Sequence, residues 1–255
     1  GGDCGCPICG GGTADSEAIA AMWAGVNAPT TNGTITQLAD YLRVTYWDDR
    51  GARDPRQFDL SSSANNGTLR YDLTGWTGTL GADTGGSYAD SNGIASLATR
   101  DLIRDAFDWY GQVLGITFIE TESGSDPAGG SVDFFFTDAD SGYYNVTKSF
   151  GGNGGNINYN VINITPSTVG NGLYSVILHE IGHGMGLGHQ GNYNASASFS
   201  VDAEYLNDSV QLSNMSYFSV SQNPNVTGSS RDPVTMQIAD LHALNQIYSA
   251  QGYGP

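Results

Sequence analysis

The chain has few basic residues. Of its 255 residues, nine are Lys or Arg and 26 are Asp or Glu, and Lys148 is the single lysine. The net charge of −17 argues against a nucleic-acid partner, because phosphate contacts need clustered Lys and Arg. No apolar run reaches the roughly 18 residues of a membrane span, so we expect no membrane partner either. The composition is that of an acidic protein kept soluble by self-repulsion, and we expect a monomer.

Cysteine is also scarce, and its three copies, Cys4, Cys6 and Cys9, all lie near the N-terminus. The body of the fold therefore has no disulfide bonds. No Pro- or Ser-rich linker divides the chain after this region. We interpret residues 1–33 as an N-terminal segment, with a propeptide-like inhibitory role as one hypothesis, and residues 34–255 as one domain.

Helical and strand patterns are mixed along the first two-thirds of the chain. Leu97, Ile103 and Phe107 recur at helical spacing, which makes their segment the clearest amphipathic helix before residue 170. A long irregular tail follows, so the order of elements predicts an α+β fold. The predicted elements are helices over 14–24, 34–47 and 95–114, strands over 68–73, 116–119, 132–136 and 157–164, and a Gly-rich loop over 76–93.

Residues 179–189 read His-Glu-Ile-Gly-His-Gly-Met-Gly-Leu-Gly-His and contain three of the four histidines. Chance produces this five-position pattern on the order of once in a million chains of this composition. His179 and His183 are four residues apart, so a helix presents both imidazoles on one face to one metal ion. Gly186 permits a left-handed turn that ends the helix and returns His189 as a third ligand. Three neutral nitrogens favour zinc and leave one position open.

Glu180 lies beside the first histidine and is the candidate general base. Zinc lowers the pKa of a bound water to about 7, and Glu180 is placed to take its proton and pass it to a leaving amine. The pattern therefore predicts peptide hydrolysis without an acyl-enzyme. A zinc-binding module without catalysis and a hydrolase of non-peptide substrates are the alternatives, and the retained Glu180 argues against the first.

The long histidine pattern resembles the signature of the metzincin zinc endopeptidases. The segment Asn214-Met215-Ser216-Tyr217-Phe218 resembles their Met-turn, and its Met-Ser-Tyr-Phe part is similar to the serralysin family of secreted bacterial proteases. The resemblance implies that Met215 is an apolar floor beneath the zinc. It also implies that Tyr217 is a movable zinc ligand that swings away to hydrogen-bond the transition-state oxyanion.

The same resemblance implies a fold, a substrate class and a location. The expected domain has a twisted mixed sheet of about five strands on a long helix and the active-site helix. A C-terminal lobe, irregular from residue 190 and ending in a helix, is expected to follow an upper lobe that ends near 189. Substrates would be proteins or peptides, and the enzyme would be extracellular. Our candidate for the edge strand that pairs with an extended substrate is the segment 132–146. Tyr143 and Tyr144 are candidates to line the cleft, with ordinary surface aromatic residues as an equal alternative. The many aspartates make calcium a second candidate ion.

Two departures from the family pattern follow the motif. Gln190 stands where the family has a proline after the third histidine, which predicts a looser turn. The calcium-binding β-roll that follows the protease domain in serralysins has no counterpart before the chain ends at Pro255.

The N-terminal sequence Cys4-Gly5-Cys6-Pro7 resembles the core of the cysteine switch in matrix metalloproteinase propeptides. In those enzymes a thiolate occupies the open position of zinc and keeps the protease latent, although they carry an arginine where this chain has Asp3. We hypothesise that Cys4 is an inhibitory zinc ligand, with Cys6 as the second candidate. A Cys6–Cys9 disulfide and an unrelated redox or metal-binding tail are the alternatives.

Overall fold

The structure is a computed structural model that describes residues 28–63, 65–122, 132–150, 154–165 and 171–255. The cysteine cluster and the helix predicted over 14–24 lie outside the described residues. Within the described part of the chain, no helix is both long and apolar enough to cross a membrane.

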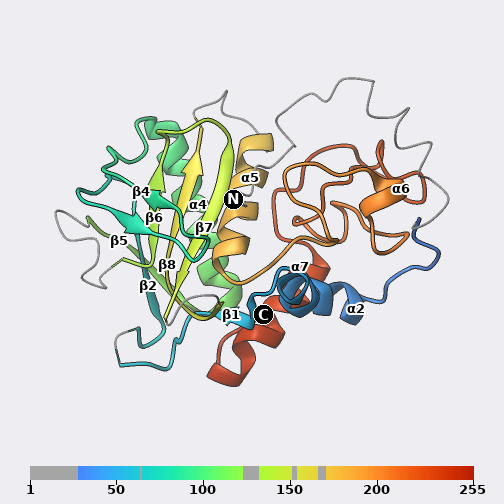
Figure 1. Cartoon of the computed structure of the whole chain (residues 1–255), viewed down its shortest axis with the longest axis horizontal. Coiled ribbons are helices and arrows are strands. Elements are labelled where there is room, and N and C mark those ends of the chain that lie inside the picture. The colour runs from blue at the N-terminus through green and yellow to red at the C-terminus, as the bar shows by residue number, and fades with distance from the viewer. Residues whose placement is uncertain (1–27, 64, 123–131, 151–153, 166–170) are drawn as a thin grey trace.

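A six-stranded mixed sheet forms one side of the molecule (Figure 1). Its order is β1-β8-β6-β2-β5, and β7 also pairs with β8. All pairs are parallel except β7 with β8, which agrees with the predicted α+β class. The strands are β1 (Arg53–Gln57), β2 (Thr68–Asp72), β5 (Thr117–Glu120), β6 (Phe134–Thr137), β7 (Tyr143–Ser149) and β8 (Gly154–Ile164).

The four strands predicted from the sequence correspond to β2, β5, β6 and β8, and all four are confirmed to within a few residues. The prediction of a plain loop over 76–93 is wrong, because this segment contains a small antiparallel hairpin of β3 (Leu80–Gly81) and β4 (Ser87–Tyr88). Each of these strands has two residues, which is too short for an alternating pattern to show in the sequence.

Two helices cover one face of the sheet, and one of them carries the histidine motif. They are α4 (Leu97–Leu114) and α5 (Asn171–Gly184). The ring of Phe134 on β6 packs against Phe107 of α4, and it also lies where a side chain at Gly184 of α5 would have to go. The two helices therefore share this face, and the core between them and the sheet is built of large apolar side chains.

The opposite face of the sheet is covered by the β3–β4 hairpin and the loop before it. Phe135, next to Phe134 on β6, points to this side and packs edge-on against Trp76 and Tyr159. Successive side chains of a strand point to opposite faces, so one Phe-rich strand supplies both layers of the core. β6 is buried along its whole length, as expected for a strand that has both faces covered.

The helix predicted over 34–47 is present but is not uniform. It begins as α2 (Ile35–Asp40), where Thr34 and Gln37 form a capping box, and it continues through a π-helical turn, η2 (Tyr41–Thr45), into α3 (Tyr46–Asp48). It packs against the C-terminal helix α7 (Ile238–Tyr248), which a short 3₁₀ turn, η4 (Ser249–Gln251), follows.

Helix α5 lies between the sheet and a largely irregular segment, residues 190–235, that contains only the short helix α6 (Phe199–Asp202) (Figure 1). The start of the described chain is tied to this segment, since Leu206 donates its backbone N–H to the carbonyl of Thr31 at 2.9 Å. The division into lobes near residue 189 and the separate segment before residue 34 stay predictions.

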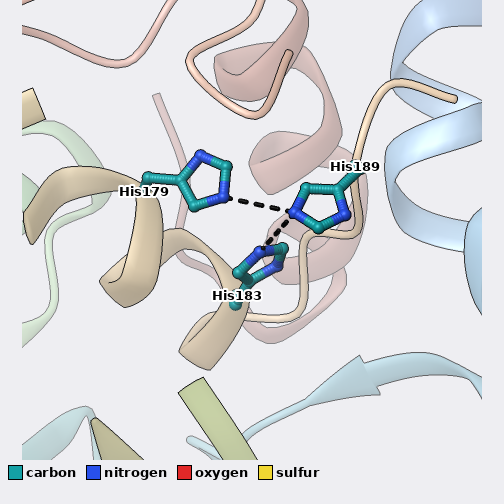
Figure 2. Close-up of side chains that lie close together, drawn as sticks. All are labelled: His179, His183 and His189. Carbon is teal, nitrogen blue, oxygen red and sulfur yellow. Dashed lines mark hydrogen bonds between the residues drawn. The ribbon is translucent and has the colours of Figure 1, made fainter. Parts of the chain in front are cut away.

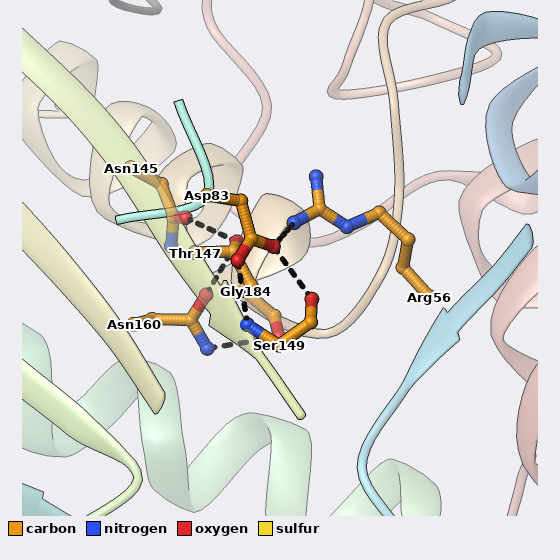
Figure 3. Close-up of polar contacts among 7 residues, drawn as sticks. All are labelled: Arg56, Asp83, Asn145, Thr147, Ser149, Asn160 and Gly184. Atoms are coloured by element: carbon orange, nitrogen blue, oxygen red, sulfur yellow. Dashed lines mark hydrogen bonds and ion pairs between the residues drawn. The ribbon is translucent and has the colours of Figure 1, made fainter. Parts of the chain in front are cut away.

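Buried polar side chains of the sheet fasten α5 (Figure 3). Asn145 on β7 donates its amide to the carbonyl of Glu180 at 3.2 Å, and Asn160 on β8 donates to the carbonyl of Gly184, also at 3.2 Å. Thr147 joins the two strands by donating to the Asn160 side chain at 2.9 Å. Because buried polar groups must be hydrogen-bonded, these bonds fix the position of α5 along its axis relative to β7 and β8 more closely than apolar contacts alone would.

Candidate metal centre

The helix that carries the motif is fixed by its apolar face. Leu173, Val176 and Ile177 are buried in the core, and the hydroxyl of Tyr110 on α4 donates to the carbonyl of Leu178 at 2.9 Å. Because this apolar face is buried, the rotation of α5 about its own axis is fixed. His179 and His183 lie one turn apart in the C-terminal half of α5 and therefore point to the same side, away from the sheet, as the four-residue spacing predicts (Figure 2).

The chain turns sharply after α5 at Gly186, which has φ +107°. Leu187 donates to the carbonyl of Gly182 at 3.0 Å, and Gly186 donates to that of His183 at 3.0 Å, which is the Schellman pattern of a helix end. A side chain at Gly186 would also collide with the carbonyl of Arg56. Glycine is therefore required here both for its backbone angle and for the close approach of β1.

The turn brings His189 to the two helical histidines (Figure 2). The Nε2 atom of His189 lies 3.3 Å from Nε2 of His179 and 3.0 Å from Nε2 of His183. Three nitrogens bound tetrahedrally to one zinc ion at about 2.0–2.1 Å would lie about 3.3 Å apart. The three side chains are buried and form the metal-competent group found among the described residues.

The other nitrogen of each ring is held by a backbone carbonyl. The Nδ1 atoms lie 2.8 Å from the oxygen of Asn214 for His179, 2.7 Å from that of Leu187 for His183, and 2.8 Å from that of Tyr193 for His189. A carbonyl only accepts, so each Nδ1 carries the hydrogen and each Nε2 presents a lone pair to the centre.

Burial keeps these imidazoles neutral. It lowers the pKa of His179 to about 4 and holds the pKa values of His183 and His189 well below the ordinary range. Neutral imidazole is the form that ligates a metal. Three lone pairs converging at about 3 Å repel one another, and a cation between them removes that repulsion. The donor set therefore fits zinc.

Glu180 is fully buried next to the first ligand, and neither of its carboxylate oxygens has a hydrogen-bond partner among the described residues. Burial raises its pKa well above the ordinary value for glutamate. A buried carboxylate without donors is unfavourable unless a positive charge is near, so its position beside three converging imidazoles fits a site that holds a cation.

The two Met-turn residues singled out from the sequence lie against the histidine motif. Met215 is fully buried, and its sulfur would lie 2.9 Å from a side chain at Gly182, so it packs directly beneath α5. The ring of Tyr217 lies with its centroid 4.5 Å from that of His189 and 6.2 Å from that of His179. The structure thus brings together all the predicted site residues except Cys4, which lies outside the described residues.

A buried aspartate on α7 supports the Met-turn. One oxygen of Asp240 accepts from the hydroxyl of Ser213 at 2.6 Å, and the other accepts from the backbone N–H of Asn214 at 2.7 Å and of Gln237 at 2.8 Å. The carbonyl of Asn214 accepts the hydrogen bond from Nδ1 of His179. Asp240 therefore helps to position the first ligand indirectly, by holding the backbone of Asn214.

A second buried aspartate, Asp208, joins the segment after the third ligand to the Met-turn. It accepts from the hydroxyl of Tyr193 at 3.1 Å and from that of Ser216 at 2.6 Å. Tyr193 supplies the carbonyl that receives His189, and Ser216 precedes Tyr217. No role was predicted for either aspartate from the sequence, because the hydroxyl and backbone groups that pair with them follow no recognisable spacing.

Asp240 gives the protein a pH dependence that can be measured. Burial raises its pKa to about 6, above the value of about 4 in an unfolded chain. The folded state therefore binds more protons between these values, and the contribution of Asp240 to the free energy of unfolding falls by up to roughly 3 kcal/mol as the pH rises from 4 to 7. In urea unfolding of the metal-free protein, the free energy of unfolding of Asp240→Asn relative to that of the wild type should therefore increase as the pH rises from 4 to 7. Parallel stability curves for the two proteins would contradict the assignment.

Comparisons with known proteins agree with a metal centre of this type over part of the chain. No protein-family model matches. Serralysin C of Dickeya chrysanthemi is 38% identical over 97 residues, and Metalloprotease AprA of Pseudomonas entomophila (strain L48) is 37% identical over 94 residues. These matches cover 36% and 35% of this chain but only 20% and 19% of the relatives, so the chain spans about a fifth of their length.

Among solved structures, the GM1 bound form of the ECX AB5 holotoxin matches 52% of this chain and 56% of that chain, with 17% identity and a TM-score of 0.27, which is too low to support an argument. The partial similarity to the two proteases and the three converging histidines together fit a metzincin-like zinc site.

Proposed function

We propose that the protein is a zinc-dependent endopeptidase with His179, His183 and His189 as its metal ligands. The observation that carries the proposal is the convergence of three neutral imidazoles, with Nε2 of His189 at 3.0–3.3 Å from the other two, beside a buried glutamate whose carboxylate has no hydrogen-bond partner among the described residues. A structural zinc site is closed by a fourth protein ligand, whereas three ligands and an adjacent carboxylate are typical of a catalytic one.

Each residue around the centre has a separate proposed role in hydrolysis. Zinc held by three imidazoles supplies Lewis-acid catalysis and an open position. Glu180 takes the proton of the attacking water and later delivers it to the nitrogen of the leaving amine, so the carboxylate ends the cycle unchanged. Tyr217 is the proposed donor to the oxyanion and the proposed movable ligand, and its ring beside His189 supports both roles.

Proteins or peptides in extended conformation are the proposed substrates. Within the predicted range 132–146, β6 is interior, because it pairs with both β2 and β8, whereas β7 pairs with β8 alone among the named strands of the described residues. A substrate strand added beside β7 would run next to α5, which contacts β7 directly. Tyr143 and Tyr144 on β7 are buried, so we do not assign them to a cleft surface. Extracellular location remains a proposal that rests on the family resemblance, and a calcium ion remains a proposal that rests on the many aspartates.

A catalytic-base variant tests the proposal. In the protein from which the N-terminal segment has been removed, casein cleavage should be abolished by a zinc chelator and restored by added zinc. Glu180→Gln should lower kcat/KM by about 100-fold to 10,000-fold while the protein still binds one zinc ion, because only the proton transfer is lost. His183→Ala is the matched variant, and it should lose zinc and activity together. A zinc-loaded wild type that cleaves no peptide bond would leave the alternative of a zinc-binding module without catalysis.

The cysteine-switch hypothesis has its own test, and it rests on Cys4-Gly5-Cys6-Pro7 alone. If Cys4 is the inhibitory ligand, Cys4→Ser should be active without any cleavage of the chain, whereas the wild type and Cys9→Ser should stay latent. Activity released by Cys6→Ser instead would assign the switch to the second candidate. Equal latency of all four proteins would exclude a cysteine on zinc.

A further inference from the structure

The third ligand is the one that secondary structure does not fix. His179 and His183 belong to α5, whereas His189 lies on irregular chain after the glycine turn. Its own Nδ1 bond goes to Tyr193, which is on the same irregular segment. A metal ligand must be held within a few tenths of an ångström, so something outside residues 184–193, which we call the histidine turn, has to hold it.

The structure places one segment against residues 186–190 of this turn. This segment, the N-terminal arm, consists of residues 34–57, from α2 through η2 and α3 to β1. Its Tyr46 ring lies edge-on to the imidazole of His189, with centroids 5.1 Å apart and planes at 87°. The same ring fills the space that a side chain at Gly188 would need.

The π-helical turn in the arm creates a hydrogen-bond acceptor for the histidine turn. In a regular α-helix the N–H of Tyr46 would bond the carbonyl of Leu42, four residues earlier. Here it bonds the carbonyl of Tyr41, five residues earlier, so the Leu42 carbonyl is released from the helix. The backbone N–H of Gly188, immediately before the third ligand, donates to this carbonyl at 2.6 Å. Single π turns of this kind are often found at functional sites.

Trp47 makes a second link, at the start of the turn. Its indole N–H donates to the carbonyl of Gly186 at 2.8 Å, and the pair is buried. The Arg56 guanidinium lies over the indole ring at 4.5 Å and also contacts Asp83 at 3.4 Å. Asp83 in turn accepts from the backbone and hydroxyl of Ser149 on β7, at 3.0 and 2.7 Å (Figure 3). The indole is therefore connected to the edge of the sheet.

Gln190 makes the third link, directly after the ligand. Its side chain is fully buried, and its amide donates to the carbonyl of Leu38 on α2 at 3.0 Å. The expectation of a looser turn from the missing proline is therefore wrong, because the glutamine ties the turn to the arm. The amide oxygen of Gln190 has no partner among the described residues, and such burial is unfavourable for stability. An apolar side chain would be the more stable choice if packing were the only requirement.

We propose that the N-terminal arm positions His189 for metal binding, with Gln190 and Trp47 as positioning residues on either side of the Leu42–Gly188 link. The inference rests on the proposed zinc site. It assigns a role to the residue in which this chain departs from the family pattern. It also assigns a role to the π-helical turn, since a regular helix would keep the Leu42 carbonyl for itself.

Metal affinity and stability separate positioning from packing. In Gln190→Met, which removes both the donor and the partnerless oxygen, the zinc dissociation constant should rise about 10-fold or more, while the unfolding midpoint of the metal-free protein stays equal or increases. Trp47→Phe should weaken zinc binding in the same way. Tyr41→Phe is the matched control, because it removes a hydrogen bond within the arm, to Asp49 at 3.1 Å, that does not reach the histidine turn. Its zinc affinity should equal that of the wild type.

Two further measurements use the same proteins. The visible absorption spectrum of the cobalt-substituted form should change in Gln190→Met and Trp47→Phe but not in Tyr41→Phe, because only the first two shift a ligand. In the metal-free wild type, the Gly188 amide should exchange its hydrogen as slowly as amides of α5, a result that needs no variant to fold.

The outcomes distinguish the two proposals. Wild-type zinc affinity in both Gln190→Met and Trp47→Phe, an equal loss in Tyr41→Phe, or fast exchange at Gly188 would overturn the role of the arm and leave the zinc site intact. A wild type that binds no zinc would instead overturn the proposed zinc site, and the role of the arm with it.

Discussion

The centre depends on one arrangement: three buried imidazoles, each with Nδ1 held by a backbone carbonyl. Those carbonyls belong to Leu187 and Tyr193 in the histidine turn and to Asn214 in the Met-turn, and all three lie on irregular chain. A carbonyl from a loop is only as well placed as the loop itself. Much of the surrounding structure therefore serves to hold these two loops, and the identity of the metal-binding nitrogens follows from where the carbonyls lie.

Buried carboxylates do much of this holding, although burial disfavours their charged form. Asp240 gathers donors of the Met-turn, and Asp208 gathers the hydroxyls of Tyr193 and Ser216. Burial raises the pKa of Asp208 to about 7 and that of Asp240 to about 6. Hydrogen bonds to backbone and hydroxyl groups partly offset that cost. A rigid centre has thus been built at some expense in stability, as is common at functional sites.

The spacing of the motif predicted much of the site because it is local. The periods of helix and turn decide where His179, His183 and His189 lie relative to one another, and alternating or amphipathic patterns predicted the long helix and four of the strands. The partners of the imidazoles could not be predicted, since a backbone carbonyl is present at every residue. The π-helical turn was invisible for a similar reason: Leu38 and Leu42 keep ordinary helical spacing, and the shift of one hydrogen bond depends on contact with the histidine turn.

Gln190 shows how tertiary contact reverses an inference from sequence. Replacing a proline predicts a more flexible turn when only the local backbone is considered. In the structure the Gln190 amide donates to a carbonyl of α2, more than a hundred residues earlier in the chain, and this hydrogen bond holds the histidine turn in place. The β3–β4 hairpin was missed for a simpler reason, since two-residue strands carry no periodic pattern.

The central claim, that three histidines hold a catalytic zinc ion, is tested most directly by X-ray absorption at the zinc edge of the full chain loaded with one equivalent of zinc. The account predicts three imidazole nitrogens at about 2.0–2.1 Å, with any further ligand being an oxygen or a sulfur at about 2.3 Å. A protein that retains no stoichiometric zinc, or a zinc shell with fewer than three imidazoles, would contradict it.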